Sequence, residues 1–203
     1  LGLPRADLAR LPGYHILFTL EPLYRDRDRF ESRLRLSADQ RRGVEDLVNS
    51  LERELDSRAA GSGFMAVAHF MLILGELSRY YGSVRTPAAQ PLQHLGRAIG
   101  YLEQHFAEKV GLDELADVGR VSRRSLTRNF RDALGCSPLE YQTRLRIRRA
   151  ADLLREGRTT ITDAASRVGY RDSNYFSRRF HAVMGVSPSE FIASLPTHGT
   201  RHA

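Results

Sequence analysis

The sequence predicts a mainly α-helical protein, with two compact helical units joined by a long helix in its second half. Three observations support this prediction. One segment of the second half occurs twice, helix-capping motifs recur along the chain, and apolar residues return every three or four positions. The first half is expected to add a pair of helices, preceded by a short β segment.

Length and composition are those of a folded protein. The chain has 203 residues, of which 41% are hydrophobic and 27% charged, enough for one or two domains. Its single cysteine, Cys136, excludes an internal disulfide and a cysteine-based metal site. The sequence shows neither a run of about 18 apolar residues nor a signal pattern, so we expect a bacterial cytoplasmic protein without a membrane partner.

Basic residues gather in the second half. The net charge is +7. Residues 1–91 hold 13 arginines against 12 acidic residues, whereas residues 92–196 hold 17 basic against 12 acidic residues. A basic domain favours a polyanionic partner, although a solvated surface explains the same composition about as often.

Residues 1–36 are predicted to hold a short strand and its turns, because the apolar run HILFTL lies between Pro12-Gly13 and Pro22. Residues 83–91 are predicted to be a linker, since proline, serine and alanine dominate them.

Residues 37–82 are predicted to form two helices. The first opens at a Ser37–Gln40 capping box and ends at Gly61 and Gly63. The second, residues 64–81, is too apolar on all sides to face water. It is therefore either a core helix beneath another domain or part of a homodimer interface.

Residues 92–195 are predicted to be helical throughout. Capping boxes are expected at Ser137, Thr160 and Ser187, and the first of them opens a long helix through Leu154. The first helix of this region carries an apolar stripe of Leu95, Ile99, Leu102 and Phe106.

A segment that starts at Ser122 recurs at Asp172, 50 residues later. Apolar, arginine, glycine and capping positions recur together: Leu126 with Phe176, Arg128 with Arg178, Phe130 with Phe180, Gly135 with Gly185, and Ser137-Pro138 with Ser187-Pro188. Upstream the offset is 49, a difference that a turn between two helices can absorb.

Each copy is predicted to contain a short helix (113–118 or 162–168), a tight turn and a second helix capped by Ser122 or Asp172. The recurring apolar residues face the core at i, i+4 spacing, and the opposite face is polar and rich in arginine. A short turn followed by such a helix is typical of the helix-turn-helix, whose second helix enters the major groove of DNA.

Residues 92–195 resemble the double helix-turn-helix domain of the AraC/XylS family of bacterial transcriptional regulators. The second copy, ITDAASRVGYRDSNYFSRRFHAVMGVSPSEF, follows the family signature almost throughout, and the first matches with LDELADVGRVSRRSLTRNFRDALGCSPLEY. Residues 14–81 more weakly resemble the end of the family's cupin-type sensor domain and its dimerising helices, closest to sugar-responsive members. The implied domains are 1–36 (C-terminal remnant of the sensor), 37–82 (dimerisation region), 83–91 (linker), 92–195 (DNA-binding domain) and 196–203 (tail).

The resemblance implies a sequence-specific transcription regulator, most often an activator, that binds double-stranded DNA at the nucleoid. It also implies a homodimer, contact with RNA polymerase, and a small-molecule effector such as a sugar, whose pocket we expect mainly upstream of Leu1. The alternative is a non-specific architectural DNA-binding protein. A helical module that binds only proteins ranks third.

By resemblance, Arg124, Thr127 and Arg128 are the base-reading positions of the first reading helix. Arginine can fork onto guanine, and threonine can contact the methyl group of thymine. In the second reading helix Asn174, Ser177 and Arg178 correspond, and their smaller side chains predict fewer base contacts. The candidate phosphate contacts are Ser122, Arg123, Arg171, Ser173 and Arg179. A solvated charged face is the alternative interpretation.

The long helix, residues 138–154, is expected to hold the reading helices about one DNA turn apart, roughly 34 Å. It would bend the DNA where the two grooves do not align. Arg146 on this helix is expected to support the structure.

No motif supports catalysis, a cofactor or a metal, so we expect that the protein is not an enzyme. The histidines at 69, 94, 105 and 181 are scattered without carboxylates at metal-ligand spacing, and no phosphate loop or nucleophile elbow occurs. Cys136 is expected to fill a buried space.

Overall fold

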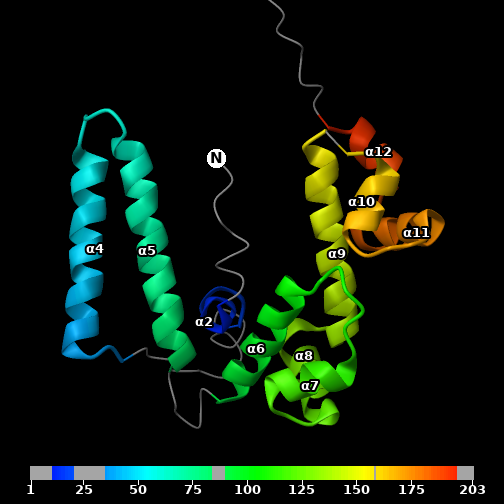
Figure 1. The fold of residues 1–203 in the computed structure, drawn as a ribbon, viewed down its shortest axis with the longest axis horizontal. Coiled ribbons are helices and arrows are strands. Elements are labelled where there is room, and N and C mark those ends of the chain that lie inside the picture. Colours follow the sequence, from blue (N-terminus) through cyan, green and yellow to red (C-terminus); the bar gives the residue numbers. More distant parts are fainter. Residues whose placement is uncertain (1–10, 21–34, 84–89, 158, 196–203) are drawn as a thin grey trace, which may run out of the picture. The chain divides into compact units, whose positions relative to one another are not determined.

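The computed structural model describes residues 11–20, 35–83, 90–157 and 159–195, and each regular element in these ranges is a helix (Figure 1). The mainly helical prediction is confirmed for this part of the chain. The chain divides into two compact units, the first comprising residues 1–104 and 113–135, the second residues 105–112 and 136–203.

The first unit begins with a short helix where the sequence predicted a strand. Helix α2, Pro12–His15, continues into the π-helical turn η1, Ile16–Leu20. The strand prediction is therefore wrong for these residues, and the rest of 1–36 lies almost entirely outside the described ranges. Pro12 suits the first helical position, and burial at residues 13, 16 and 20 follows a helical spacing. A short apolar run by itself does not distinguish a strand from a buried helical segment.

Helices α4, Ala38–Asp56, and α5, Ser62–Ser83, form the predicted helical pair and pack against each other (Figure 1). The capping box at Ser37 is confirmed, with both of its hydrogen bonds to Gln40 present. The predicted end of α4 is wrong, because Gly61 lies in the following turn and Gly63 lies inside α5. Ser57 ends the helix earlier: its backbone is extended, and its hydroxyl accepts a hydrogen bond from the amide of Ala59.

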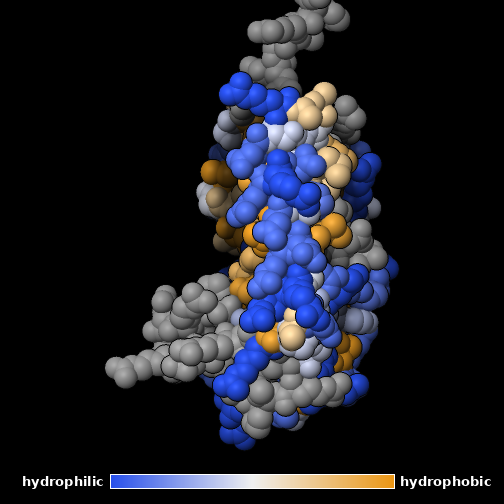
Figure 2. All heavy atoms as spheres, turned by 90° about the vertical axis from the view of Figure 1, so that its left-hand side faces the viewer, coloured by the Kyte–Doolittle hydropathy of each residue, from blue (hydrophilic) through white to orange (hydrophobic). Residues whose placement is uncertain are grey.

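The hairpin leaves much of α5 uncovered. Only Ala66, Ile73 and Ser78 are buried on this helix. Figure 2 looks onto the α4 side, where a hydrophilic strip runs along the molecule with hydrophobic residues beside it. The large apolar side chains of the hairpin that remain exposed are called here the hairpin apolar surface: Val48, Leu55, Phe64, Met65, Val67, Phe70 and Leu72.

The first unit also contains α6, Gln90–Gln104, α7, Leu112–Gly119, and α8, Arg123–Leu134. The predicted stripe of α6 is confirmed at Leu95, Ile99 and Leu102, which are buried with Leu115 and Ala116 of α7. Of the predicted linker, residues 84–89 lie outside the described ranges, while Ser83 and Gln90 belong to helices.

The second unit is built on α9, Pro138–Arg155, against which α10, Ile161–Arg167, α11, Ser173–Met184, and α12, Pro188–Ala193, pack. The long helix and the capping boxes at Ser137 and Ser187 are confirmed. At Thr160 only half of the predicted box forms: the Thr160 hydroxyl accepts a hydrogen bond from the amide of Asp163. The Asp163 carboxylate accepts a hydrogen bond from the Thr160 hydroxyl instead of from the Thr160 backbone amide. The core of this unit is Ile147, Ala150, Ala151, Leu154, Ala164, Ala165, Val168, Tyr170, Phe176 and Phe180.

Candidate nucleic-acid interface

Helix α8 has a buried apolar face and an exposed basic one. Leu126 is 1% exposed and Phe130 fully buried, whereas Arg124 and Arg128 are exposed and Thr127 is half-buried. The helix starts at Ser122, whose hydroxyl accepts the amide of Ser125 at 3.2 Å, and ends at Gly135 with φ +65°. Because cap and stop are both local, this helix is well defined independently of a ligand. Its exposed face has the donors that base edges and phosphates accept.

Arg131 extends the same face and was missed in the sequence. It is exposed and lies seven residues after Arg124, which is two helical turns. Arg123 differs from the other arginines of α8, because its guanidinium is paired with Asp113 of α7. Both side chains remain largely exposed, so this pair is weak and a phosphate could compete for the guanidinium.

Helix α11 repeats this design with a stronger cap. The Asp172 carboxylate accepts the amides of Asn174 and Tyr175 at 2.8 and 2.9 Å. These bonds stabilise the charged form and lower the pKa of Asp172. Phe176 and Phe180 are fully buried, and Gly185 ends the helix with φ +78°.

Two of the three predicted base-reading side chains of α11, Ser177 and Arg178, have local partners. Asn174 and Arg178 are exposed, but the half-buried Ser177 donates its hydroxyl proton to the Ser173 carbonyl at 2.9 Å. That hydroxyl is therefore left with acceptor capacity only. The guanidinium of Arg178 lies 6.0 Å from the ring centre of Tyr175, which is 47% exposed. Tyr175 was missed in the sequence, although its spacing of three residues from Arg178 could have indicated the pair.

Arg179 is half-buried in the second unit, and its buried Nε atom has no hydrogen-bond partner. Burial raises the pKa of Tyr170, and the charges of Arg146 and Arg179 oppose that rise. Because Arg179 is half-buried, its guanidinium is less accessible to a phosphate than that of an exposed arginine.

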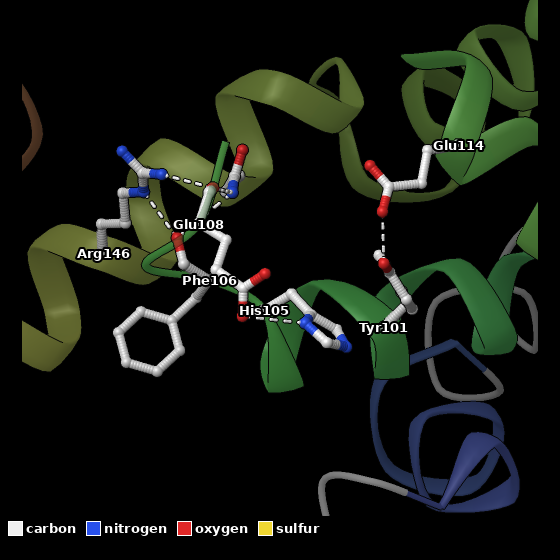
Figure 3. A network of polar contacts seen from close by, with 7 residues as sticks. Tyr101, His105, Phe106, Glu108, Glu114 and Arg146 are labelled. Carbon is white, nitrogen blue, oxygen red and sulfur yellow. Dashed lines mark hydrogen bonds and ion pairs between the residues drawn. The ribbon is translucent and has the colours of Figure 1, made fainter. Parts of the chain in front are cut away.

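Two side chains of α9, Gln142 and Arg146, bind the loop that follows α6 and are called here the clasp. Arg146 donates from Nε to the Phe106 carbonyl at 2.6 Å, from Nη2 to the Glu108 carbonyl at 2.7 Å and from Nη1 to the Gly169 carbonyl at 3.3 Å. Gln142 donates to the carbonyls of Phe106 and Glu108 at 3.1 and 2.9 Å. Figure 3 shows Arg146 pointing at these carbonyls. The supporting role predicted for Arg146 matches this geometry.

The clasp borders an open cleft in the second unit. Two of the predicted phosphate residues, Arg171 and Ser173, line it together with Lys109. Lys109 is the only lysine of the chain and lies more than 60 residues from Arg171 in sequence, so no local pattern could have pointed to it. The fold thus brings two predicted anion-binding side chains together and adds a third.

Relatives of known family share this architecture. A helix-turn-helix domain family matches residues 115–194. The C-terminal domain of AraT, a response regulator from Geobacillus stearothermophilus, is 33% identical; the match covers 54% of this chain and 93% of that one, with a TM-score of 0.50. The chain belongs to the AraC/XylS family of transcriptional regulators. An AraC-type transcriptional regulator from Chromobacterium violaceum is 29% identical with a TM-score of 0.50, over 56% of this chain and all of that one.

Another AraC/XylS relative is the HTH-type transcriptional activator RhaS of Shigella boydii. It is 33% identical over 147 residues, which are 72% of this chain and 52% of the relative. The chain therefore spans about half the length of the curated relatives it matches. This family is one of transcription regulators and not of enzymes.

The part of the chain that the structure describes contains no cluster of three potential metal ligands and no helix long and apolar enough to span a bilayer. The ring of His94 donates to the Gly119 carbonyl at 2.6 Å and that of His105 lies 3.0 Å from the Glu108 carboxylate, so both have structural partners. Cys136 is 4% exposed and burial raises the pKa of its thiol, which fits the expected filler.

Proposed function

We propose that this AraC/XylS protein binds double-stranded DNA sequence-specifically and activates transcription in response to a small-molecule effector, with sugars as the first candidates. The observation that carries the proposal is the repeated reading helix. Both α8 and α11 bury an aromatic-containing face, end at a left-handed glycine and expose polar side chains on the other side. A polar helix face that is held by its own unit is what a major groove accepts.

The six base-reading side chains are unequal in chemistry. Arg124 and Arg128 offer forked donors that match the O6 and N7 atoms of guanine, and Thr127 offers a methyl group to thymine. Asn174 matches adenine, but the hydroxyl proton of Ser177 is already donated to the Ser173 carbonyl, and α11 offers one arginine, Arg178, where α8 offers two. We therefore propose that α8 supplies most of the base discrimination.

The backbone of the DNA would be held by a second set of side chains. Arg171 and Ser173 border the same cleft as Lys109, and this cluster is the strongest candidate for a phosphate. Ser122 and Arg123 sit at the start of α8, where unpaired backbone amides and the helix dipole also favour an anion. Among the arginines, Arg179 is the weakest candidate, because it is half-buried whereas Arg123 and Arg171 are exposed.

The proposal includes a homodimer and contact with RNA polymerase. The hairpin apolar surface supports the dimer, since Phe64 is 63%, Leu72 53% and Phe70 48% exposed on one helix. Exposed apolar groups of this size commonly mark protein contacts. Sedimentation velocity should give a dimer for the chain and a monomer for a variant with Phe70→Glu.

DNA recognition is tested by selecting a target from random duplexes and titrating it against random competitor at fixed salt. Sequence-specific binding requires an affinity gap of roughly 10³-fold or more, whereas an architectural protein would bind both DNAs alike. Binding to neither DNA at low salt would point to a module that binds only proteins. Footprints and reporter expression with candidate sugars then test the effector and activation.

Arg128→Ala separates base reading from phosphate contact. It should weaken binding to the selected site by about 1–3 kcal/mol and relax the preference at one base pair. Arg58→Ala is the matched control, because it removes the same charge from the exposed turn between α4 and α5. An equal loss for Arg128→Ala on selected and random DNA would instead indicate a phosphate contact.

A further inference from the structure

Residues 12–20, called here the N-terminal wedge, pack against α5 and α6 of the first unit (Figure 1). Ile16 is 3% and Leu20 0% exposed, so the inward side of the wedge is as buried as the core. Helix α6 is buried on more than the side that faces its own helix-turn-helix, since Gly96 and Gly100 are covered too.

Two glycines allow the wedge to touch its neighbours backbone to backbone. A Cβ atom at Gly13 would lie 1.7 Å from the Ser78 carbonyl oxygen of α5. A Cβ atom at Gly96 of α6 would lie 2.8 Å from the Pro12 carbonyl oxygen and 3.0 Å from Cγ1 of Ile16. Neither position tolerates a larger residue without displacing the wedge, so the fit is specific to these two helices.

Helix α6, which meets the wedge, is also linked to the turn of the first helix-turn-helix. Two residues before Gly96, the ring of His94 donates to the Gly119 carbonyl at 2.6 Å. That carbonyl opens the turn before α8, in which Arg120 adopts φ +54°, an uncommon conformation for a residue with a side chain. A second link joins α6 to α7 through the hydrogen bond from Tyr101 to Glu114 (Figure 3).

We propose that the N-terminal wedge is an internal docking element that couples the α4–α5 hairpin to the first reading helix. The wedge packs between α5 and α6 and restrains the position of α6. Helix α6 then restrains the turn before α8, and this turn determines the orientation of α8. A change in the hairpin that expels the wedge would loosen α8 and lower the DNA affinity of the first unit. The core of the second unit is formed by residues between Ile147 and Phe180, with Phe106 and Phe191 packed against it, so reading by α11 should be insensitive to the wedge.

The test compares two glycine-to-alanine variants in the full chain. Gly96→Ala places its Cβ against the wedge, whereas Gly75→Ala, inside α5, meets nothing within 4 Å. Both changes raise helix propensity by about 1 kcal/mol, so the control matches the local effect. Ile16→Asp, at a buried position of the wedge, is paired with Phe18→Asp, at a position 44% exposed.

Binding is measured on the selected site, on a site scrambled in the bases protected by α8, and on one scrambled in those protected by α11. On the sites that keep the bases protected by α8, Gly96→Ala and Ile16→Asp should weaken binding by roughly 5- to 150-fold. This is the usual range of the coupling between two sites. Binding through the α11 bases should stay unchanged, which also shows that the variants fold. The two control variants should bind like the wild type at every site.

A double variant adds a readout that a general loss of stability would not produce. If Gly96→Ala already expels the wedge, then Ile16→Ala added to it should cause no further loss of affinity. Hydrogen exchange should show residues 12–20 losing protection in Gly96→Ala and keeping it in Gly75→Ala.

The proposed coupling rests on the proposed DNA binding, and different results would refute each of these proposals. If the wild type shows no selected site, the proposed function fails. If the wild type binds its site and Gly96→Ala, with the wedge unprotected, binds equally well, the coupling is wrong. Full protection of the wedge in Gly96→Ala would also overturn it, because the close approach would then not exist.

Discussion

Replacing Arg146 by alanine should destabilise the second unit more than any other single arginine change on α9. The side chain donates three hydrogen bonds to backbone carbonyls and lies 5.4 Å from the ring centre of Tyr170. A hydrogen bond from a charged donor contributes about 1.5–3 kcal/mol. Gln142 would still donate to two of the three carbonyls, which reduces the loss. We therefore expect the free energy of unfolding to fall by about 2–4 kcal/mol.

Urea unfolding followed by circular dichroism measures this change. Arg144→Ala is the control, since Arg144 is exposed on the same helix and its loss should change stability by about 0.5 kcal/mol or less. Arg146→Lys should recover less than half of the loss, because an ammonium group cannot reach carbonyls on both sides as a planar fork does.

The clasp also predicts non-additivity. Gln142→Ala combined with Arg146→Ala should cost more than the two single changes together, because the Phe106 and Glu108 carbonyls then lose both donors. A loss below about 0.5 kcal/mol for Arg146→Ala, or strictly additive losses, would refute this account of the clasp.

Three further predictions concern the second unit and the DNA. Gly169→Ala should lower the free energy of unfolding by about 2–5 kcal/mol, because φ is +87° and the new Cβ would lie 2.0 Å from the Ala107 carbonyl oxygen. Gly157→Ala is the control: its Cβ would meet nothing within 4 Å, so only the strain of the positive φ should reduce that free energy, by about 1–2 kcal/mol. The low pKa of Asp172 means that its cap stabilises above the ordinary carboxyl pKa and is lost as pH falls through the lowered value. Melting temperature should thus depend less on acid pH in Asp172→Asn, and equal dependence would contradict the cap. Circularly permuted fragments should reveal a bend by their mobility; uniform mobility would argue against bending.

Much of the second half could be predicted because its determinants are local. Caps at Ser122, Ser137 and Ser187 and stops at Gly135 and Gly185 act within a few residues, so the helix bounds follow from short patterns. The repeat strengthened the prediction of the helix-turn-helix units, since two copies of one pattern rarely arise by chance. The exposed face of α8 followed from the burial of Leu126 and Phe130.

The first half was harder to predict, because tertiary packing decided between secondary structures that the local sequence allows equally. The run after Pro12 reads equally as strand or helix, and its contacts with α5 and α6 select the helix. The extended Ser57 ended α4 before the glycines that were expected to do so.

The sequence alone therefore determined the family, the repeated unit and the polar faces of α8 and α11, since these depend on residues three to four positions apart. Only the tertiary structure decided which of those side chains are already paired, as in Arg123 of α8 with Asp113 of α7. It also placed Lys109 in the same cleft as Arg171 and Ser173, and the N-terminal wedge against Gly96. The physical reason is that hydrogen bonds and close packing between distant segments depend on where the chain returns in space, which helical periodicity does not encode.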